Sequence, residues 1–520
     1  MKMPSGRIHR TEWRTRGGSA SPAIRLTMGL TLLTSGVTGV PPARAADDTD
    51  WKREALSALL KMPHDRDAEG SSQVTPPVIP SLVLSKDPLG WIGSLNQAGA
   101  TITADSPFFQ NLGSNGRTCF TCHQPQNGWG ISAAAVQQTF KDTDGMAPIV
   151  RPVDGAVCPT AGVLTMQERR DAYSLLLSKG VIRIGLPVPA AAEFSITAVS
   201  DPYGCNTAPS TGLTAPNSGI VSVYRRPLPT TNLGFVNAIM WDGREPSLQS
   251  QAVDATIGHA QGETPLTPEQ VGAIVAFETG LLTAQSQVKT VGDLGAGGAT
   301  GGPNGLQDTL AAFFPGTNDP LGGNPQGTAF SSTVFDLYDR WIGSADQNRA
   351  AIQRGQAVFN TKPIAITGVN GINDVLGLPM LSGFCGTCHD SPNVGNHSVK
   401  LPINIGISNA GPFNAATGTG AAPILDIAGL PVFTVTCNAG VHQGTVYTVT
   451  DLGRGMISGA CADIGKVKGP VLRGLASRAP YFHNGTAASL DDVVTFYDQR
   501  FGIQFTEEER SDLVAFLNAL

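Results

Sequence analysis

The sequence has few charged residues and, beyond its first 45 residues, no long apolar run. Charged residues make up 15% of the 520 residues and hydrophobic residues 41%, a balance typical of a globular protein with a buried core. The formal net charge is −6, and because residues 1–45 carry +6, the rest of the chain carries −12. This acidity argues against nucleic acid or anionic membranes as partners, and it allows docking to a small basic electron carrier. Nothing beyond residue 45 predicts a transmembrane helix.

The first 45 residues have the parts of an export signal. A basic segment is followed by the apolar run "LTMGLTLLTSGVTGV" at 26–40, which is too short to span a bilayer. Ala43-Arg44-Ala45 then matches a cleavage site. We therefore expect residues 1–45 to be a signal peptide and the mature protein to be periplasmic or secreted, the alternative being a disordered basic tail.

The chain contains the motif C-x-x-C-H twice, as "CFTCH" at 119–123 and "CGTCH" at 385–389. Two cysteines at this spacing reach the two vinyl groups of one haem c, and the adjacent histidine ligates the iron. A redox C-x-x-C does not need the histidine, and a zinc site needs two further ligands. We therefore predict two covalently bound haem c groups. Their ligands are Cys119, Cys122, His123, Cys385, Cys388 and His389.

Four further cysteines need partners or a role, because an oxidising compartment permits disulfides. Cys158 and Cys205 lie in one segment relative to the two motifs, and Cys437 and Cys461 lie in another. The simplest prediction pairs Cys158 with Cys205 and Cys437 with Cys461, although spacing alone does not determine connectivity.

The periodicity of the sequence predicts a mainly α fold with long irregular loops and few short strands. "SADQNRAAIQRGQAVFN" (344–360) begins with a cap signal at Ser344. Ser489 precedes a helix that opens with acidic residues, and a capping box joins Thr506 to Glu509 before a final amphipathic helix. We expect two cytochrome c-like haem domains, at 46–345 with an insertion and at 346–520.

Longer motifs carry a family resemblance. The two C-x-x-C-H motifs, "MWDGREPSLQSQA" (240–252) and "KGPVLRGLASRAPYFHNGTAASLDDVVTFY" (468–497) together resemble the bacterial di-haem cytochrome c peroxidase and MauG superfamily. The resemblance spans roughly residues 85–520, without a counterpart for about 140–225 and 285–330. It implies that oxidant reacts at the N-terminal haem and that the C-terminal haem transfers electrons. In the family a tryptophan lies between the haems, and Trp241 occupies the matching position, where it is either an electron relay or a packed core residue. Arg244 either pairs with a haem propionate or ties down its turn.

The resemblance leaves the sixth ligand of the second haem open. Peroxidases of the family have a methionine fourteen residues after the position of His483, where this chain has Tyr497, the MauG-like arrangement. His483 is the rival ligand, because the similar rubber oxygenases use a bis-histidine haem. Met456 is a third candidate.

The pocket of the first haem departs from the family pattern. Gln251 matches the family's glutamine, but Gln261 stands where the family has its acid–base glutamate, and an amide cannot shuttle protons in the same way. His259 and Glu263 are close enough in sequence to substitute. No histidine lies between His123 and His259, so the first haem is either open or capped by His259.

A calcium ion commonly lies between the haems in this family. The resemblance implies Asn232 and the backbone near Arg478 and Pro480 as its ligands, although lone amide and carbonyl ligands are a weak signal. Calcium is therefore the third expected cofactor, after the two haems.

Three functions are compatible with these features. The leading one is a periplasmic di-haem peroxidase of the MauG type, which reacts with hydrogen peroxide or O2 and takes electrons from a small redox protein such as a cytochrome c or a cupredoxin. The second is an oxygenase that acts on an organic substrate. The third is an electron carrier without catalysis, which requires both irons to be saturated with ligands.

Overall fold

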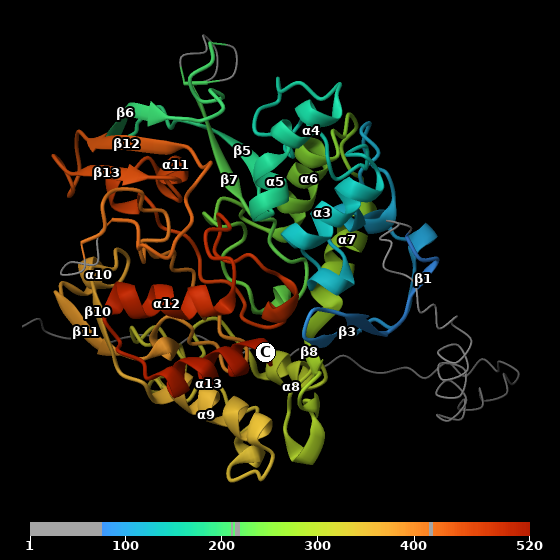
Figure 1. Cartoon of the computed structure of the whole chain (residues 1–520), viewed down its shortest axis with the longest axis vertical. Helices are drawn as coiled ribbons and strands as arrows, with labels where there is room; N and C mark the ends of the chain where they lie inside the picture. The colour runs from blue at the N-terminus through green and yellow to red at the C-terminus, as the bar shows by residue number, and fades with distance from the viewer. Residues whose placement is uncertain (1–74, 210–211, 214–218, 415–419) are drawn as a thin grey trace, which may run out of the picture. The chain divides into compact units, whose positions relative to one another are not determined.

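The computed structural model describes residues 75–209, 212–213, 219–414 and 420–520 (Figure 1). The predicted signal peptide, residues 1–45, lies outside this part of the chain. The helices are α2 (Cys119–Cys122), α3 (Ala133–Asp142), α4 (Met166–Ala172), α5 (Ser174–Lys179), α6 (Leu248–His259), α7 (Pro268–Gly280), α8 (Gly305–Ala312), α9 (Gln347–Thr361), α10 (Asn373–Leu376), α11 (Gly455–Ser458), α12 (Leu490–Phe501) and α13 (Glu507–Asn518).

The prediction of a mainly α fold is wrong. Of the described residues, 31% are helical and 17% are in strands or bridges, and the strands form several antiparallel sheets. Their orders are β1-β4, β10-β11, β13-β12-β6, β2-β3-β8-β9 and β5-β7. The strands are β1 (Val78–Ile79), β2 (Leu82–Lys86), β3 (Gly90–Asn96), β4 (Thr101–Ile102), β5 (Ile182–Pro187), β6 (Phe194–Ser200), β7 (Ile220–Arg225), β8 (Leu281–Val288), β9 (Gly292–Asp293), β10 (Ile364–Thr367), β11 (Met380–Gly383), β12 (Val432–Cys437) and β13 (Val446–Val449).

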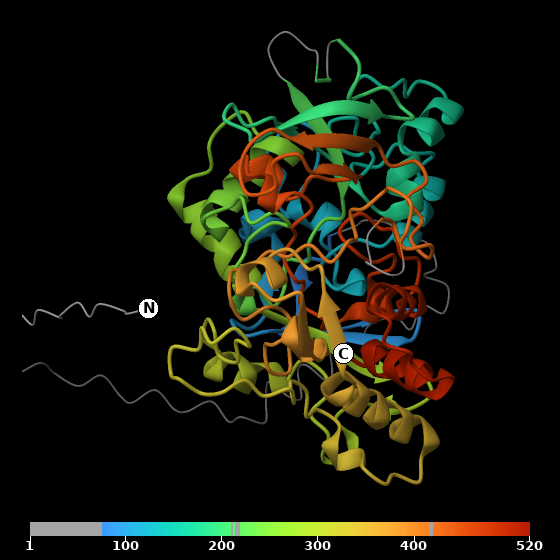
Figure 2. The same cartoon turned by 90° about the vertical axis from the view of Figure 1, so that its left-hand side faces the viewer.

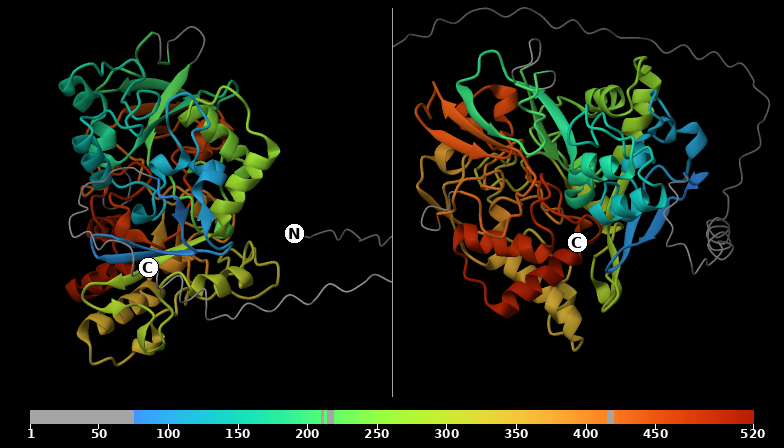
Figure 3. Two further views of the ribbon diagram at one scale, coloured as in Figure 1. Left: turned by 90° about the vertical axis from the view of Figure 1, so that its right-hand side faces the viewer. Right: turned by 45° about the horizontal axis from the view of Figure 1, so that its top comes forward.

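The β13-β12-β6 sheet shows why the strands were underestimated. Strand β6 lies in the segment 140–225, whereas β12 and β13 come from the C-terminal half. The three strands lie side by side in Figure 2 and Figure 3. Strand β12, "VFTVTC", alternates between half-buried and buried residues, as a strand with one face in the core does. Each strand is short, and its partner is far away in the sequence, so local patterns gave little indication of the sheet.

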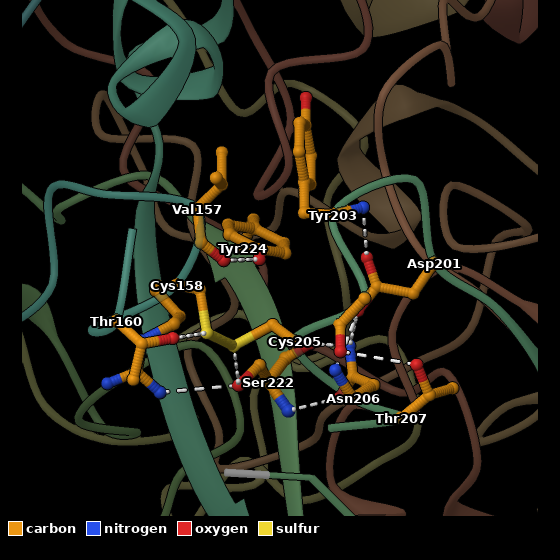
Figure 4. Close-up of a disulfide and its surroundings, with 12 residues drawn as sticks. Val157, Cys158, Thr160, Asp201, Tyr203, Cys205, Asn206, Thr207, Ser222 and Tyr224 are labelled. Atoms are coloured by element: carbon orange, nitrogen blue, oxygen red, sulfur yellow. Dashed lines mark hydrogen bonds between the residues drawn. A yellow bond between two sulfur atoms is a disulfide. The ribbon is translucent and has the colours of Figure 1, made fainter. Parts of the chain in front are cut away.

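Both predicted disulfides are confirmed. Cys437, at the end of β12, is bonded to Cys461, and Cys158 is bonded to Cys205. Figure 4 shows the second bond beside β7, where the hydroxyl of Tyr224 donates to the carbonyl of Val157 (Figure 4). These bonds fasten the segments that carry the unpredicted strands.

Helices α9, α12 and α13, which lie in the lower left part of Figure 1, contribute buried residues to one apolar core. Helix α13 packs along α9, and its residues Leu513, Phe516 and Leu517 are buried as predicted. The capping box of Thr506 and the cap at Ser489 are confirmed. The predicted cap at Ser344 is wrong, because Asp346 accepts the first free amides of α9.

The same core also contains residues of 291–341, which include the buried Phe335 and Trp341. Strand β8 joins this region to the chain end, because the amide of Gln285 donates to the carbonyl of Leu520. The described residues all lie in one compact unit, Asp67–Leu520. The division into haem domains at 46–345 and 346–520 stays a prediction. Within the described ranges, no helix combines the length and apolar character needed to cross a membrane.

The cap of α13 yields a stability prediction. In the Thr506→Ala variant the amide of Glu509 loses its side-chain acceptor, so we expect the free energy of unfolding to fall by about 1 kcal/mol. Thr361→Ala, on the exposed surface near the end of α9, is the control and should change it by less than about 0.5 kcal/mol. Denaturant titration measures both, and equal effects would contradict the assignment of the cap.

Candidate functional site

The two C-x-x-C-H motifs fold into the same local structure. Cys119–Cys122 forms the single turn α2, and Cys385–Thr387 forms the 3-10 turn η7. In each copy the histidine amide donates to the carbonyl of the first cysteine, at 3.0 Å. None of the four cysteines forms a disulfide, and burial raises the pKa of their thiols. Each turn therefore presents two thiols and an imidazole together.

The imidazoles of His123 and His389 are oriented in the same way. Nδ1 of His123 is 2.9 Å from the carbonyl oxygen of Trp129, and Nδ1 of His389 is 2.7 Å from that of Gly395. Because a carbonyl only accepts, each Nδ1 must carry the proton, which leaves Nε2 as a free ligand atom. Burial lowers the pKa of each histidine to about 4, so both rings are neutral near pH 7. A neutral imidazole with a carbonyl partner is typical of a metal ligand.

Each motif lines a large cavity. His123, Cys119 and Cys122 line one cavity of about 180 Å³, which we name the first cavity. His389, Cys385 and Cys388 line another of about 210 Å³, the second cavity. The donor sets and the mainly apolar walls therefore fit one haem c in each cavity.

Trp241 lies in the wall that the two cavities share. Its indole Nε1 donates to the carbonyl of Arg226 at 2.8 Å, and its own carbonyl accepts from the amide of Lys468 at 2.8 Å. These bonds hold the ring and the backbone of Trp241 in the wall that borders both cavities, and its role as a relay stays a prediction.

Buried cations line the shared wall. Arg226, Lys468 and Arg478 each border both cavities, and no carboxylate of the described residues forms an ion pair with any of them. Burial lowers the pKa of Lys468 to about 8 and that of Arg478 to about 10. Such a wall suits an anionic group such as a haem propionate. Arg244 borders the first cavity and pairs with Asp242 at 3.1 Å, which ties down its turn.

Tyr497 and His389 both line the second cavity and lie close together there. The hydroxyl of Tyr497, on α12, lies 3.5 Å from the Nε2 atom of His389. Burial raises the pKa of Tyr497 above its ordinary value. The phenol oxygen and the imidazole therefore face one another across the second cavity.

His483 also lines the second cavity, but its Nε2 atom has other partners. It lies 3.3 Å from Oγ of Ser408 and 3.4 Å from a carboxylate oxygen of Asp451. The third candidate ligand, Met456, packs in the apolar core around the Cys437–Cys461 disulfide and lines neither cavity. Of the three candidates, only Tyr497 lies within hydrogen-bond distance of His389.

In the first cavity, a carboxylate orients His259. Nδ1 of His259 lies 2.6 Å from Asp154, whose other oxygen is 2.6 Å from Nη1 of Arg117. Burial opposes ionisation, but Arg117 and then His259 hold the pKa of Asp154 below its usual range. Gln251 lines this cavity, whereas the side chains of Gln261 and Glu263 are exposed. The structure thus brings together His259 and Gln251 but leaves Gln261 outside.

Sequence reasoning missed Asp154, Arg117 and Glu278. Asp154 and Arg117 are far from His259 in the sequence, and no local pattern joins them. Glu278, on α7, lines the first cavity, and its Oε2 atom has no hydrogen-bond partner among the described residues. Burial raises the pKa of Glu278 to about 8. A lone glutamate in the apolar run "AIVAFETG" was the one available signal.

Asn232, the predicted calcium ligand, lines neither cavity. Its amide group bonds the backbone of Thr283 in both directions, at 2.8 and 2.9 Å. Its side-chain oxygen is therefore already used as an acceptor.

Comparison with known proteins finds relatives of similar sequence. The chain is 45% identical over 69 residues to cytochrome-c peroxidase IdrP1 of Denitromonas iodatirespirans, which covers 11% of this chain and 18% of that protein. It is 23% identical over 313 residues to cytochrome-c peroxidase IdrP1 of Pseudomonas sp. (strain SCT), which covers 56% and 66%. The predicted resemblance to the di-haem cytochrome c peroxidase and MauG superfamily is therefore confirmed.

These matches are partial. The chain spans about a fifth of the length of the first two curated relatives, IdrP1 and IdrP2 of Denitromonas iodatirespirans. No family model matches the chain. Among solved structures, a MauG-like protein associated with microbial copper homeostasis is 18% identical, with a TM-score of 0.31, over 58% of this chain and 74% of that one. That similarity is too low to carry an argument.

The charge network beside His483 yields a second prediction. Asp451 and Asp242 share the buried Arg225, at 2.6 and 2.5 Å, and Arg225 and His483 hold the pKa of Asp451 well below its usual range although burial opposes this. Asp451→Asn should lower the free energy of unfolding by about 3–5 kcal/mol, because it leaves a buried charge partly unpaired.

The effect should depend on pH. A depressed carboxyl pKa stabilises the fold above the ordinary aspartate pKa of about 3.9, and this contribution is lost as the pH falls below that value. The difference between wild type and Asp451→Asn should therefore shrink in acid. Asp491→Asn, which breaks an exposed pair with Arg510, is the control and should cost at most about 1 kcal/mol. A pH-independent difference would contradict the argument.

Proposed function

We propose that the chain is a di-haem c oxidoreductase that reacts with hydrogen peroxide at the haem held by His123 and passes electrons through the haem held by His389. The observation that carries the proposal is the place of Trp241 in the wall shared by two cavities, each with its own C-x-x-C-H turn. The relatives named cytochrome-c peroxidase support it. Bound haem would supply the redox chemistry, and the residues below would control it.

In the first cavity, His259 takes the role of acid–base group that the family gives to a glutamate. Asp154 accepts the Nδ1 proton, so Nε2 of His259 is a base that can take a proton from peroxide and return it to the leaving oxygen. Arg117 keeps Asp154 ionised and in place. Gln251 is the neighbouring hydrogen-bonding group in this cavity.

In the second cavity, Tyr497 is the proposed sixth ligand of the iron. It faces the Nε2 atom of His389, whereas His483 is directed to Ser408 and Asp451. Binding to iron would require the phenol to lose its proton, and the resulting phenolate would favour the ferric state of a bound haem. The two haems would then differ in function because their distal residues differ, although their attachment sites are alike.

The proposed partners follow from charge and chemistry. Without residues 1–45 the chain carries a net charge of −12, which favours encounter with a small basic redox protein, a cytochrome c or a cupredoxin. The proposed compartment is the periplasm, where haem c proteins and disulfides are both expected.

Optical and EPR spectra of the ferric protein test the proposal. We expect one high-spin haem that reacts with stoichiometric peroxide and one low-spin haem that does not bind it directly. Tyr497→Phe should alter the low-spin signal and leave the high-spin signal unchanged, which assigns the two haems. The proposal would be contradicted if both haems were low-spin and neither responded to peroxide, in the oxidised or the half-reduced protein.

The role of His259 is tested by the rate of the peroxide reaction. His259→Gln should slow it by about 10²- to 10⁴-fold, the usual contribution of a general acid–base group. Asp154→Asn should slow it by about ten- to a hundred-fold, because the imidazole loses the carboxylate that orients it. Both are measured by stopped-flow absorbance, as a function of pH.

Glu263→Gln is the matched control and should react like wild type, because Glu263 is exposed and does not line the first cavity. If His259→Gln instead converted a low-spin haem into a high-spin one, His259 would be an iron ligand, and its role as acid–base group would be excluded.

A further inference from the structure

The guanidinium of Arg226 is buried in a cage of backbone carbonyls. Nη2 donates to the carbonyls of Ile131 and Arg478, at 2.7 and 2.6 Å, and Nη1 donates to that of Lys179 at 3.1 Å. Burial lowers the pKa of Arg226 to about 10, so the side chain is still a cation near pH 7. The structure therefore places a fixed positive charge in an oxygen-lined site.

The backbone of Arg226 is tied to the same region. Its amide donates to the carbonyl of His483 at 2.6 Å, and its carbonyl accepts from the indole of Trp241 at 2.8 Å. Arg226 also borders both cavities. The caged charge consequently lies in the wall between the two proposed haems.

Two of the oxygens expected to bind calcium, those of Asn232 and Arg478, accept hydrogen bonds from the chain instead. Calcium takes six to eight oxygen ligands. The side-chain oxygen of Asn232 accepts from the amide of Thr283, and the carbonyl of Arg478 accepts from Arg226. No group of three or more acidic, histidine or cysteine side chains in the described ranges could hold a metal ion. The wall that contains Arg226 also contains the cationic residues Lys468 and Arg478, and this concentration of positive charge disfavours a divalent cation.

We infer that the guanidinium of Arg226 takes the place of the calcium ion between the haems, so that this protein needs no calcium. The carbonyl of Arg478, one of the expected calcium ligands, binds a side-chain cation that cannot dissociate from the chain. The inference uses the proposed function only to name the two cavities as haem sites.

Calcium dependence is the first test, on the full haem-loaded protein. After dialysis against EGTA, we expect no stoichiometric calcium by mass spectrometry of the metals, and no shift of the unfolding temperature when calcium is added back. Stoichiometric calcium, with a fall of the unfolding temperature on its removal, would overturn the inference. Neither readout depends on peroxide chemistry, so failure of the proposed function would show separately, in the spectra.

The charge itself is tested by Arg226→Gln and Arg226→Lys. Arg226→Gln removes a positive charge beside both cavities, so the reduction potentials of both haems should shift to more negative values. Arg226→Lys keeps the charge but loses the planar fork, so the potentials should stay near wild type while the unfolding temperature falls.

Arg473→Gln is the matched control. Arg473 is also a buried guanidinium held by three backbone carbonyls, those of Gly302, Asn393 and Leu520, but it borders neither cavity. The Arg473→Gln substitution should lower the unfolding temperature without changing the reduction potentials of the haems. Equal potentials in Arg226→Gln and wild type would overturn the inference, and if that variant does not fold, calcium content and the Arg226→Lys variant decide.

Discussion

The buried charge of Arg226 is the constraint on which the centre of the molecule depends. Removing a guanidinium from water is costly unless its donors find partners, and here three backbone carbonyls accept hydrogen bonds from it. Those carbonyls come from the loop after the first motif, from the end of α5 and from the C-terminal motif. Since the backbone of the same residue also binds the indole of Trp241 and the carbonyl of His483, the side chain and backbone of Arg226 together connect the segments that separate the two cavities.

Around this centre, two like anchors have unlike surroundings. His123 and His389 each donate Nδ1 to a carbonyl six residues ahead, and each ring is neutral because it is buried. Apart from these shared features, the first cavity contains the imidazole of His259 held by a carboxylate, whereas the second contains the phenol of Tyr497 directed at His389. The two sites therefore share the C-x-x-C-H turn and differ in the residues around it, and this difference is the basis of the division of labour proposed for the two haems.

Sequence patterns predicted what is local. The haem-binding motifs, the caps of α12 and α13 and both disulfides depend on short spacings or on a small number of cysteines. The sheets escaped prediction because β6 and β12 meet only through tertiary structure, with Thr197 bonded to Thr434, 237 residues away. The partner of His259 escaped for the same reason, since Asp154 lies 105 residues earlier in the chain. Asn232 was predicted as a calcium ligand from its position in the family motif, but that position does not reveal the two hydrogen bonds that its side-chain amide makes to the backbone of Thr283.

The segment 140–225, which has no counterpart in the family resemblance, supplies part of each arrangement that makes this chain unusual. Asp154 comes from it and orients His259, at a site where the family's glutamate is replaced by the exposed Gln261. Lys179, also from it, contributes a carbonyl to the cage of Arg226. The same segment thus contributes both to the orientation of His259 and to the binding of the Arg226 guanidinium. The segment is therefore not peripheral to the cavities, because Asp154 lines the first cavity and the carbonyl of Lys179 binds Arg226, which borders both cavities.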